Sequence, residues 1–353
     1  MAREFTIGTH DISDAGKCYV IAEVGHNHQG SVKTCMELFK AAKDCGVSAV
    51  KLQKRNNRAL YTTAMYNKPY DNENSYGPTY GAHREALEFG PEQYRDLQQY
   101  CKELDVDFFA TAFDFDSADF LQLIDVPAYK IASGDLKNTP LLRHVAKFGK
   151  PLVVSTGGAT IDDVRRAHDV VLEHNHQLCL LQCTAGYPAE WKELDLRVIA
   201  TYREMFPESA IGYSGHDNGI AMAVAAFVLG ARVIEKHFTL NRAWKGTDHP
   251  FSLEPVGMRK MVRDLERTWL AMGDGVKKIY SSEVSPIIKM GKKLVAARTL
   301  QVGHVLREED ICLKSPADGI PPYELENVVG RRLLQPLIEE ETILFEMLGK
   351  PEA

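Results

Sequence analysis

The sequence predicts a (β/α)8 TIM barrel followed by a small β-rich C-terminal module, and three observations support the barrel. Short apolar runs rich in β-branched residues recur about eight times along the chain. A longer segment with helical apolar spacing follows each of them. Polar side chains stand where the runs end. Such alternation, repeated over roughly 250 residues, is typical of a closed barrel. A doubly wound sheet is the alternative, but no GxGxxG motif follows the first run.

The predicted strands are spread along the first 240 residues or so of the chain. They are CYVIAEVG at 18–25, AVKLQ at 49–53, DFFATAF at 107–113, AYKIASG at 128–134, PLVVSTG at 151–157, LCLLQCT at 178–184, AIGYSGH at 210–216 and RVIEKHF at 232–238. Helical spacing is clearest at 32–45, 92–104, 161–173 and 219–229. Thr160 precedes IDDVRRAHDVV and is a suitable N-cap residue for the third of these helices.

The length predicts more than one domain. A chain of 353 residues is longer than a usual single domain. The barrel is expected over 1–275, a linker over 276–291 and the module over 292–353. About 60 residues can only just sustain a core alone, so the module is expected to pack on a barrel, either its own or that of a partner.

One predicted connection, 54–90, is unusually long and is rich in Tyr, Asn and Gly. Compact domains rarely carry a loop of this length without a function. We therefore expect a lid that faces the substrate.

Composition excludes several classes of protein. The formal net charge is -6, from 42 basic and 48 acidic residues, and no long basic run occurs. Nucleic acid and anionic membrane surfaces are therefore not expected partners. No window approaches ~20 apolar residues, and the first residues are polar, as in a chain without a signal peptide. The seven scattered cysteines form no CxxC pair, which predicts reduced thiols and a cytoplasmic location.

Polar residues at or just after the strand ends define the predicted site. They are Glu23, Lys51, Gln53, Thr111, Lys130, Ser133, Ser155, Thr184, Ser214, His216, Glu235 and His237. In a (β/α)8 barrel the carboxyl ends of all strands meet at one rim, where active sites form.

Two histidines at this rim indicate a metal site. His216 ends the seventh predicted strand and His237 ends the eighth, so both imidazoles can reach one divalent ion and leave open positions. The alternative is one structural and one exposed histidine. Glu235 shares the direction of His237 by strand alternation and could support it.

Lysines and hydroxyls indicate an anion pocket. Lys51, Lys130 and Lys236 come from three strand ends, and a buried lysine needs a carboxylate or an anionic ligand. Hydroxyls are added by Thr111, Ser133, Ser155 and Ser214. This set favours a small substrate with a phosphate and a carboxylate; the alternative is lysine–glutamate pairing across the barrel.

A general acid or base is also expected. Glu23 ends an apolar run, where burial would raise its pKa towards neutrality. Its alternative role is that of an ion-pair partner for Lys51.

Motifs placed in this way resemble the sialic acid synthase family over nearly the whole chain. They are IAEVGHNHQGS, AVKLQK, PAYKIASGD, PLVVSTGG, LLQCTAGYP, IGYSGHD, VIEKHFTL and KGTDHPFSLEP. The C-terminal module resembles the antifreeze-like SAF domain of that family. The resemblance implies condensation of phosphoenolpyruvate with an N-acylated hexosamine, typically N-acetylmannosamine or its 6-phosphate, to a nine-carbon keto acid.

The resemblance also implies roles for residues. His216 and His237 would hold a divalent metal, Mn²⁺ or Mg²⁺, and Glu23 would shuttle a proton. Phosphoenolpyruvate would contact Lys51, Thr111, Lys130, Ser133, Ser155 and Ser214. The sugar would contact Gln53, Asn74, Asp135, Tyr187 and Asp248. The family's homodimer is domain-swapped, with each C-terminal module over the partner's barrel mouth, and we expect the same here.

Three departures from the family pattern concern the sugar. Asp135 stands where bacterial members have Glu, Ala185 where they have Asn, and Ser315 where they have Arg. The reaction is therefore better supported than the sugar, and a legionaminate- or pseudaminate-type synthase is the alternative.

The lid resembles the branch that takes 6-phosphorylated sugars, whose phosphate Lys68, His83 or Arg84 could meet. A Schiff-base aldolase would need one desolvated lysine rather than several among hydroxyls. A carbohydrate-binding or scaffold protein would leave the metal and anion residues unexplained.

Overall fold

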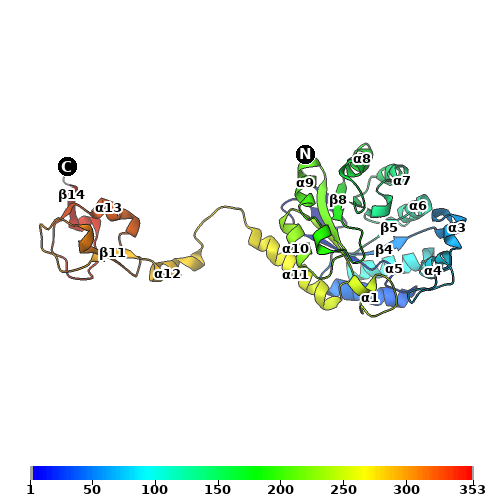
Figure 1. The fold of residues 1–353 in the computed structure, drawn as a ribbon, viewed down its shortest axis with the longest axis horizontal. Coiled ribbons are helices and arrows are strands. Elements are labelled where there is room, and N and C mark those ends of the chain that lie inside the picture. The colour runs from blue at the N-terminus through cyan, green and yellow to red at the C-terminus, as the bar shows by residue number, and fades with distance from the viewer. Residues whose placement is uncertain (1–2, 352–353) are drawn as a thin grey trace. The chain divides into compact units, whose positions relative to one another are not determined.

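The computed structural model describes residues 3–351, which fall into two compact units (Figure 1). The first unit ends at Gly273 and the second begins at Asp274. The seven cysteines are all unpaired. Within residues 3–351, no helix is long and apolar enough to cross a lipid bilayer.

The first unit is the predicted barrel. Eight parallel strands close on themselves in the order β10-β3-β4-β5-β6-β7-β8-β9. They are β3 Tyr19–Glu23, β4 Ala49–Lys54, β5 Asp107–Ala112, β6 Tyr129–Ile131, β7 Leu152–Ser155, β8 Leu178–Cys183, β9 Ala210–Gly215 and β10 Val233–His237. Each lies within or overlaps a predicted apolar run, and the fold class is confirmed.

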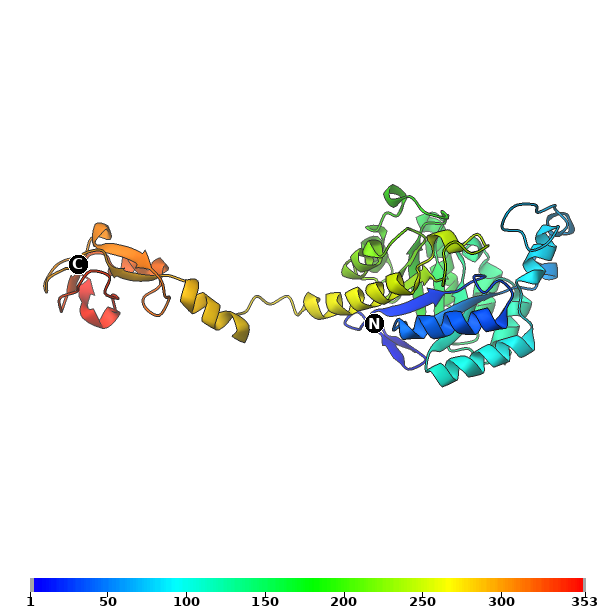
Figure 2. The same ribbon diagram turned by 90° about the horizontal axis from the view of Figure 1, so that it is seen from below.

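Helices surround the barrel. They are α1 Val32–Asp44, α5 Pro91–Leu104, α6 Phe115–Leu123, α7 Thr139–Ala146, α8 Ile161–Leu172, α9 Val198–Met205, α10 Ala221–Val228 and α11 Pro255–Met272. Figure 2 shows α1 beside α5 and α11 on the outside of the barrel. Thr160 caps α8 as predicted, because its hydroxyl accepts from the backbone N–H of Asp163, whose carboxylate accepts in return from the backbone of Thr160.

A short hairpin precedes the barrel and was not predicted. Strands β1 Phe5–Ile7 and β2 His10–Ile12 pair antiparallel. Asp107, the first residue of β5, accepts hydrogen bonds from His10 and from the Tyr19 hydroxyl, so the hairpin packs at the amino ends of the barrel strands. Strands of three residues carry too little alternation to be recognised in a sequence.

The predicted lid is partly helical. Residues 54–90 contain α2 Asn57–Leu60, α3 Thr63–Tyr66 and α4 Tyr80–Ala86. Thr79 caps α4, and the Tyr80 ring packs edge-on against Tyr61 and Tyr70. The tyrosines noted in the sequence therefore form the internal packing of this segment.

The second unit has a small core of its own. It contains α12 Ser281–Met290, β11 Lys293–Ala296, β12 Ile311–Lys314, α13 Leu325–Val328, β13 Arg331–Leu333 and β14 Leu348–Pro351. Leu294, Leu306, Val328 and Ile343 are fully buried. The predicted linker is thus partly helical, since α12 lies within it. Short 3-10 helices in the two units are η1 Ser133–Asp135, η2 Trp191–Glu193, η3 His249–Phe251, η4 Glu308–Asp310, η5 Pro322–Glu324 and η6 Phe345–Met347.

Gly212 in β9 gives a test of barrel packing. A Cβ added there would lie 2.3 Å from Leu181 Cδ2 and 2.4 Å from the Val233 carbonyl oxygen. We expect Gly212→Ala to lower the free energy of unfolding by roughly 1–3 kcal/mol, because the neighbouring backbone must shift. Urea unfolding of the purified protein measures it. Gly257→Ala in α11 is the control, since its Cβ would approach only a Leu253 methyl at 3.3 Å and alanine favours helix. Equal loss in both variants would contradict the packing argument.

Candidate active site

A cavity of about 660 Å³ opens at the carboxyl ends of the barrel strands. Most of the predicted site residues line it: Glu23, Lys51, Gln53, Asn74, Thr111, Lys130, Ser133, Ser155, Tyr187, Ser214, His216, Glu235, His237 and Asp248. The predicted residues Asp135, Thr184 and Lys236 do not line it. The volume lies in the usual range for small-molecule sites.

The register of the strands places the charged residues next to one another. Glu23 at the end of β3 is paired with Lys51 on β4 and with His237 on β10. Thr111 on β5 is likewise paired with Lys130 on β6. Because the strands are parallel and staggered around a closed barrel, residues from distant segments share one level of its interior.

Two buried lysines and two buried glutamates form the centre of the cavity. Lys51 Nζ lies 2.5 Å from Glu23 Oε2 and 3.7 Å from Glu235 Oε2. Lys130 Nζ lies 3.9 Å from Glu235 Oε1. The lysine–glutamate pairing considered as an alternative is therefore present.

Hydroxyl groups complete the shell of this charged centre. Lys51 donates to Thr111 Oγ1 at 2.8 Å, and Lys130 donates to Ser155 Oγ at 2.7 Å. Ser214 donates to Glu235 at 3.0 Å. Three of the four predicted hydroxyl residues thus contact the same charged groups that an anion would meet. The fourth, Ser133, accepts from the backbone N–H of Gly157 at 2.9 Å.

The two glutamates differ in their acidity. Burial raises the pKa of Glu23, and the neighbouring Glu235 carboxylate adds to this against the opposing effect of Lys51. Burial also acts on Glu235, but Lys130 and Lys51 outweigh it and lower its pKa to about 2. When the pair holds one proton, that proton resides on Glu23. The two ammonium groups then face a single carboxylate, which leaves positive charge for an anion.

The two predicted metal ligands lie side by side. The rings of His216 and His237 have their centroids 5.4 Å apart. His216 Nδ1 donates to the Thr184 carbonyl at 2.9 Å, which leaves Nε2 with a free lone pair. Burial lowers the pKa of His237, which favours the neutral, ligating form, and its Nδ1 is buried without a hydrogen bond.

This chemistry fits a divalent metal with two imidazole ligands and open positions. Among residues 3–351, no group of three or more His, Cys, Asp or Glu side chains is arranged to hold a metal ion.

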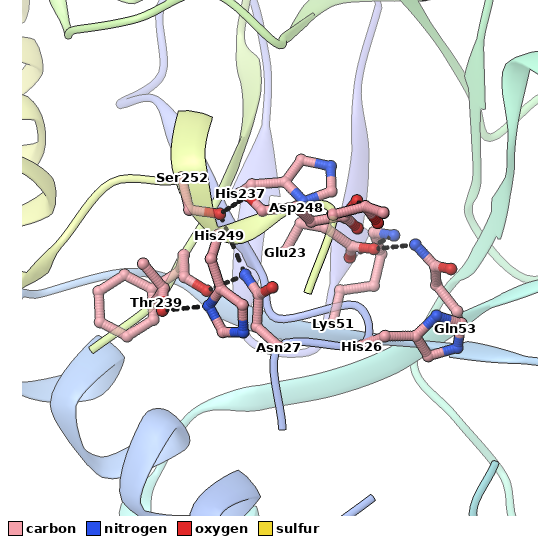
Figure 3. A network of polar contacts seen from close by, with 12 residues as sticks. Glu23, His26, Asn27, Lys51, Gln53, His237, Thr239, Asp248, His249 and Ser252 are labelled. Carbon is pink, nitrogen blue, oxygen red and sulfur yellow. Dashed lines mark hydrogen bonds and ion pairs between the residues drawn. The ribbon is translucent and has the colours of Figure 1, made fainter. Parts of the chain in front are cut away.

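A buried network supports the loop after β10, which carries Asp248 (Figure 3). Asn27 donates to the Phe238 carbonyl at 2.9 Å and to Ser252 Oγ at 3.0 Å. Ser252 donates to the Asp248 carbonyl at 2.6 Å. The carboxylate of Asp248 lies 3.7 Å from His237 Nδ1. The IAEVGHN motif therefore helps to position Asp248 beside the histidines.

The lid closes one side of the cavity. The Asn74 side-chain oxygen accepts from the backbone N–H of Gly246 at 2.9 Å, and the Tyr76 hydroxyl donates to the Lys245 carbonyl. These contacts join the lid to the loop that carries Asp248. On the other side, Tyr187 packs on His216 with centroids 4.3 Å apart.

Lys236 was expected to belong to the anion pocket, and this prediction was wrong. It does not line the cavity: its Nζ donates to Asp217 Oδ1 at 3.0 Å and to the Asp217 carbonyl at 2.6 Å. The reason is strand alternation, because Lys236 faces away from the side shared by Glu235 and His237. Asp135 also lies outside the cavity lining, where its carboxylate accepts from Asn138.

Some cavity residues were missed or left unassigned in the sequence. Arg55 lines the cavity, together with Cys183, His26 and Arg84. One signal for Arg55 was available, because Lys51, Gln53 and Arg55 alternate along the end of β4 and its exit. Lys68 is exposed, and His83 is buried with Nδ1 accepting from the Tyr76 N–H.

Comparison with known proteins identifies the class of this barrel. The chain belongs to the NeuB family, whose model matches residues 38–277, and a SAF domain matches residues 293–349. Human N-acetylneuraminate-9-phosphate synthase is 38% identical over 94% of this chain and 92% of its own. An N,N'-diacetyllegionaminic acid synthase of Legionella pneumophila is 34% identical over 93% of this chain and 94% of its own.

A solved structure agrees with these sequence relatives. The N-acetylneuraminic acid (sialic acid) synthetase of Leptospira borgpetersenii, in complex with citrate, is 30% identical. It matches 81% of this chain and 96% of its own, with a TM-score of 0.71. The relatives named here are synthases, and the resemblance to the sialic acid synthase family is confirmed.

Proposed function

We propose that this protein is a transferase that condenses phosphoenolpyruvate with N-acetylmannosamine or N-acetylmannosamine 6-phosphate. The products are N-acetylneuraminate or its 9-phosphate, and inorganic phosphate. The observation that carries the proposal is the cavity centre, in which two buried lysines, an asymmetric pair of glutamates and two neighbouring histidines face one space. Membership of the NeuB family supports it.

Phosphoenolpyruvate would occupy the centre between Lys51 and Lys130. Both ammonium groups already contact hydroxyls, so an incoming phosphate or carboxylate would meet a complete set of donors. The residues assigned to it are Lys51, Thr111, Lys130, Ser133, Ser155 and Ser214. The sugar would lie towards the lid, in contact with Gln53, Asn74, Tyr187 and Asp248; Asp135 would act only from outside the cavity lining.

The reaction needs a proton delivered to the aldehyde oxygen, and it needs both protons removed from the water whose oxygen becomes the C2 carbonyl. C3 of phosphoenolpyruvate attacks the aldehyde carbon, and the protonated carboxyl of Glu23 gives its proton to the aldehyde oxygen. Water then adds at C2, and the Glu23 carboxylate takes a proton from it. The tetrahedral intermediate then breaks its C2–O bond to phosphate: the C2 hydroxyl becomes the carbonyl, and its proton leaves with the phosphate as hydrogen phosphate.

Gln53 holds Glu23 for this task. Its amide donates to Glu23 Oε1 at 2.7 Å, so the carboxyl keeps a fixed orientation beside Lys51 (Figure 3). His216 and His237 would hold the metal, Mn²⁺ or Mg²⁺. When bound, such an ion supplies Lewis-acid polarisation of the aldehyde oxygen.

A legionaminate-type synthase is the second candidate. Ala185, one of the three departures from the family pattern, lines the cavity, and the Legionella relative shares 34% of its residues with this chain. A different modified hexose would then be the acceptor, with the same phosphoenolpyruvate chemistry. The domain-swapped homodimer and the cytoplasmic location stay predictions from the sequence.

The direct test is phosphate release from phosphoenolpyruvate with Mn²⁺, using N-acetylmannosamine and its 6-phosphate in parallel. Release that requires one of these sugars supports the proposal. No release with either, but release with a diacetylated legionaminate precursor, would favour the second candidate.

Lys130→Met tests where phosphoenolpyruvate binds. We expect KM for phosphoenolpyruvate to rise roughly 10- to 100-fold, because the variant loses a buried charge-assisted contact. Steady-state phosphate release measures this. Lys137→Met, an exposed lysine that does not line the cavity, is the control and should keep the original KM. An unchanged KM in Lys130→Met would contradict the assignment.

A further inference from the structure

Two arginines, Arg55 and Arg84, line the lid side of the cavity. Arg55, only 7% exposed, donates from Nη2 to Gln53 Oε1 at 2.6 Å, and its face packs on the Phe113 ring. Arg84 donates from Nε and Nη2 to the Tyr80 hydroxyl. Neither guanidinium forms a salt bridge with any residue in 3–351, and Glu88 and Asp248 act on them only from a longer distance. Lys51, in contrast, lies 2.5 Å from a Glu23 oxygen.

Both arginines contact the same histidine. Arg55 Nη1 lies 3.0 Å from His26 Nε2, and Arg84 Nη1 lies 3.0 Å from His26 Nδ1. A guanidinium only donates, and a neutral imidazole accepts at one nitrogen alone. Only one of these two contacts can therefore be a hydrogen bond.

The cluster of Arg55, Arg84 and His26 contains N–H donors that are shielded from water and have no acceptor among residues 3–351. Burial and the two guanidiniums hold the pKa of His26 well below its usual value, so the imidazole adds no acceptor beyond its single lone pair. Arg55 Nε is buried without any hydrogen-bond partner. Buried donors without acceptors cost free energy, and the buried Arg55 cation repels the neighbouring, half-buried Arg84 cation. A bound anion relieves both.

We propose that Arg55, Arg84 and His26 form a second anion subsite, which takes the phosphate of a 6-phosphorylated N-acylhexosamine. The inference rests on the proposed function, because it names the acceptor in that reaction. The subsite and the Lys51–Lys130 centre line the same cavity. Gln53 connects them, because it accepts from Arg55 and donates to Glu23. A phosphate offers enough oxygens for two guanidinium forks, and a neutral sugar hydroxyl does not.

Lys68, His83 and Arg84 were the lid residues that the sequence suggested for a phosphate, and the structure favours Arg84. Arg84 lines the cavity, whereas Lys68 is exposed and His83 is engaged by the Tyr76 N–H, and neither lines the cavity. The opposing explanation is that the cluster only fastens α4 to the barrel.

The experiment compares N-acetylmannosamine with its 6-phosphate in the full-length protein. The wild type is expected to prefer the phosphorylated sugar roughly 10- to 100-fold in kcat/KM. In Arg84→Met this ratio should fall to within about threefold, since the sugar contacts remain and the phosphate contacts do not. Lys68→Met is the control and keeps the wild-type ratio. Equal proportional losses on both sugars in Arg84→Met would show a fastening role only and overturn the proposal.

Binding without turnover separates this inference from the proposed reaction. Isothermal titration of the wild type with each sugar should show at least about tenfold tighter binding of the phosphorylated one. If neither sugar supports phosphate release but this preference holds, the condensation proposal fails and the subsite stands. If the wild type binds both sugars equally well, the subsite proposal is wrong. This titration uses the wild type only, so it decides the question even if Arg84→Met does not fold. Inorganic phosphate titrated alone should bind at least about tenfold more weakly than the sugar phosphate; equal binding would show a free-phosphate site instead.

Discussion

Replacing His237 with alanine is expected to lower phosphate release by roughly a thousandfold or more, and to abolish stoichiometric binding of Mn²⁺. His237 and His216 lie side by side in the cavity, with ring centroids 5.4 Å apart. In the proposed site they are the two protein ligands of the metal, so the loss of one leaves a single imidazole. A Lewis acid contributes several kcal/mol to a reaction that places charge on an aldehyde oxygen, which corresponds to this factor. Steady-state kinetics and metal analysis of the purified variant provide the two measurements.

The matched control is His176→Ala. His176 is exposed in the turn before β8 and belongs to no site, so both its activity and its metal content should equal those of the wild type. His216→Ala should behave as His237→Ala does, because its Nδ1 is fixed by Thr184 and only Nε2 is free. Retention of full activity by His237→Ala at low metal concentration would refute the two-histidine metal site.

Glu23→Gln is expected to reduce kcat by roughly 10²- to 10⁴-fold, the usual contribution of a general acid or base. The amide keeps the shape and the contact with Gln53, but it cannot deliver a proton. Lys51 would lose its nearest carboxylate, at 2.5 Å, so binding of phosphoenolpyruvate should not weaken. A lower kcat with an equal or lower KM for phosphoenolpyruvate would identify a proton-transfer role rather than a binding role.

The protonation state of Glu23 determines how the rate should change with pH. Burial raises the pKa of Glu23 above its ordinary value of 4.5, so the protonated form persists to higher pH. In the proposed reaction the protonated carboxyl acts first, so we expect the rate to fall as pH rises through that raised pKa. This alkaline limb should be absent in Glu23→Gln.

Glu88→Gln is the control for the pH profile. Glu88 is also partly buried, and burial raises its pKa, but it pairs with Lys54 and does not line the cavity. Its variant should keep the wild-type profile. Persistence of the alkaline limb in Glu23→Gln would assign that limb to another group.

The barrel could be predicted from the sequence because each strand is a short apolar run with a polar end. The helices could be predicted where capping is local, as at Thr160, whose partner Asp163 is three residues away. The same local rule placed His237 and Glu235 on one side of β10. By the same alternation Lys236, which lies between Glu235 and His237, points to the other side of β10 and is excluded from the anion pocket.

Other features depended on contacts between segments far apart in the chain. The hairpin at the amino end is held by Asp107, which lies about a hundred positions away. Arg55 meets Arg84 through His26, three residues from three separate segments. No periodicity reports such a meeting, because it depends on the path of the lid in space.

The sequence by itself determined the class of fold, the order of strands and the residues at the rim, since alternation and polarity at strand ends are local properties. Only the tertiary structure decided which charges pair and which stay free. Closure of the barrel places Lys51 and Lys130 against Glu23 and Glu235, and it makes one glutamate hard and the other easy to ionise. The path of the lid brings His26 and Tyr80 to the guanidinium groups of Arg55 and Arg84, which form no salt bridge within residues 3–351. Pairing and burial depend on distance in space, and distance in space is a property of the folded chain alone.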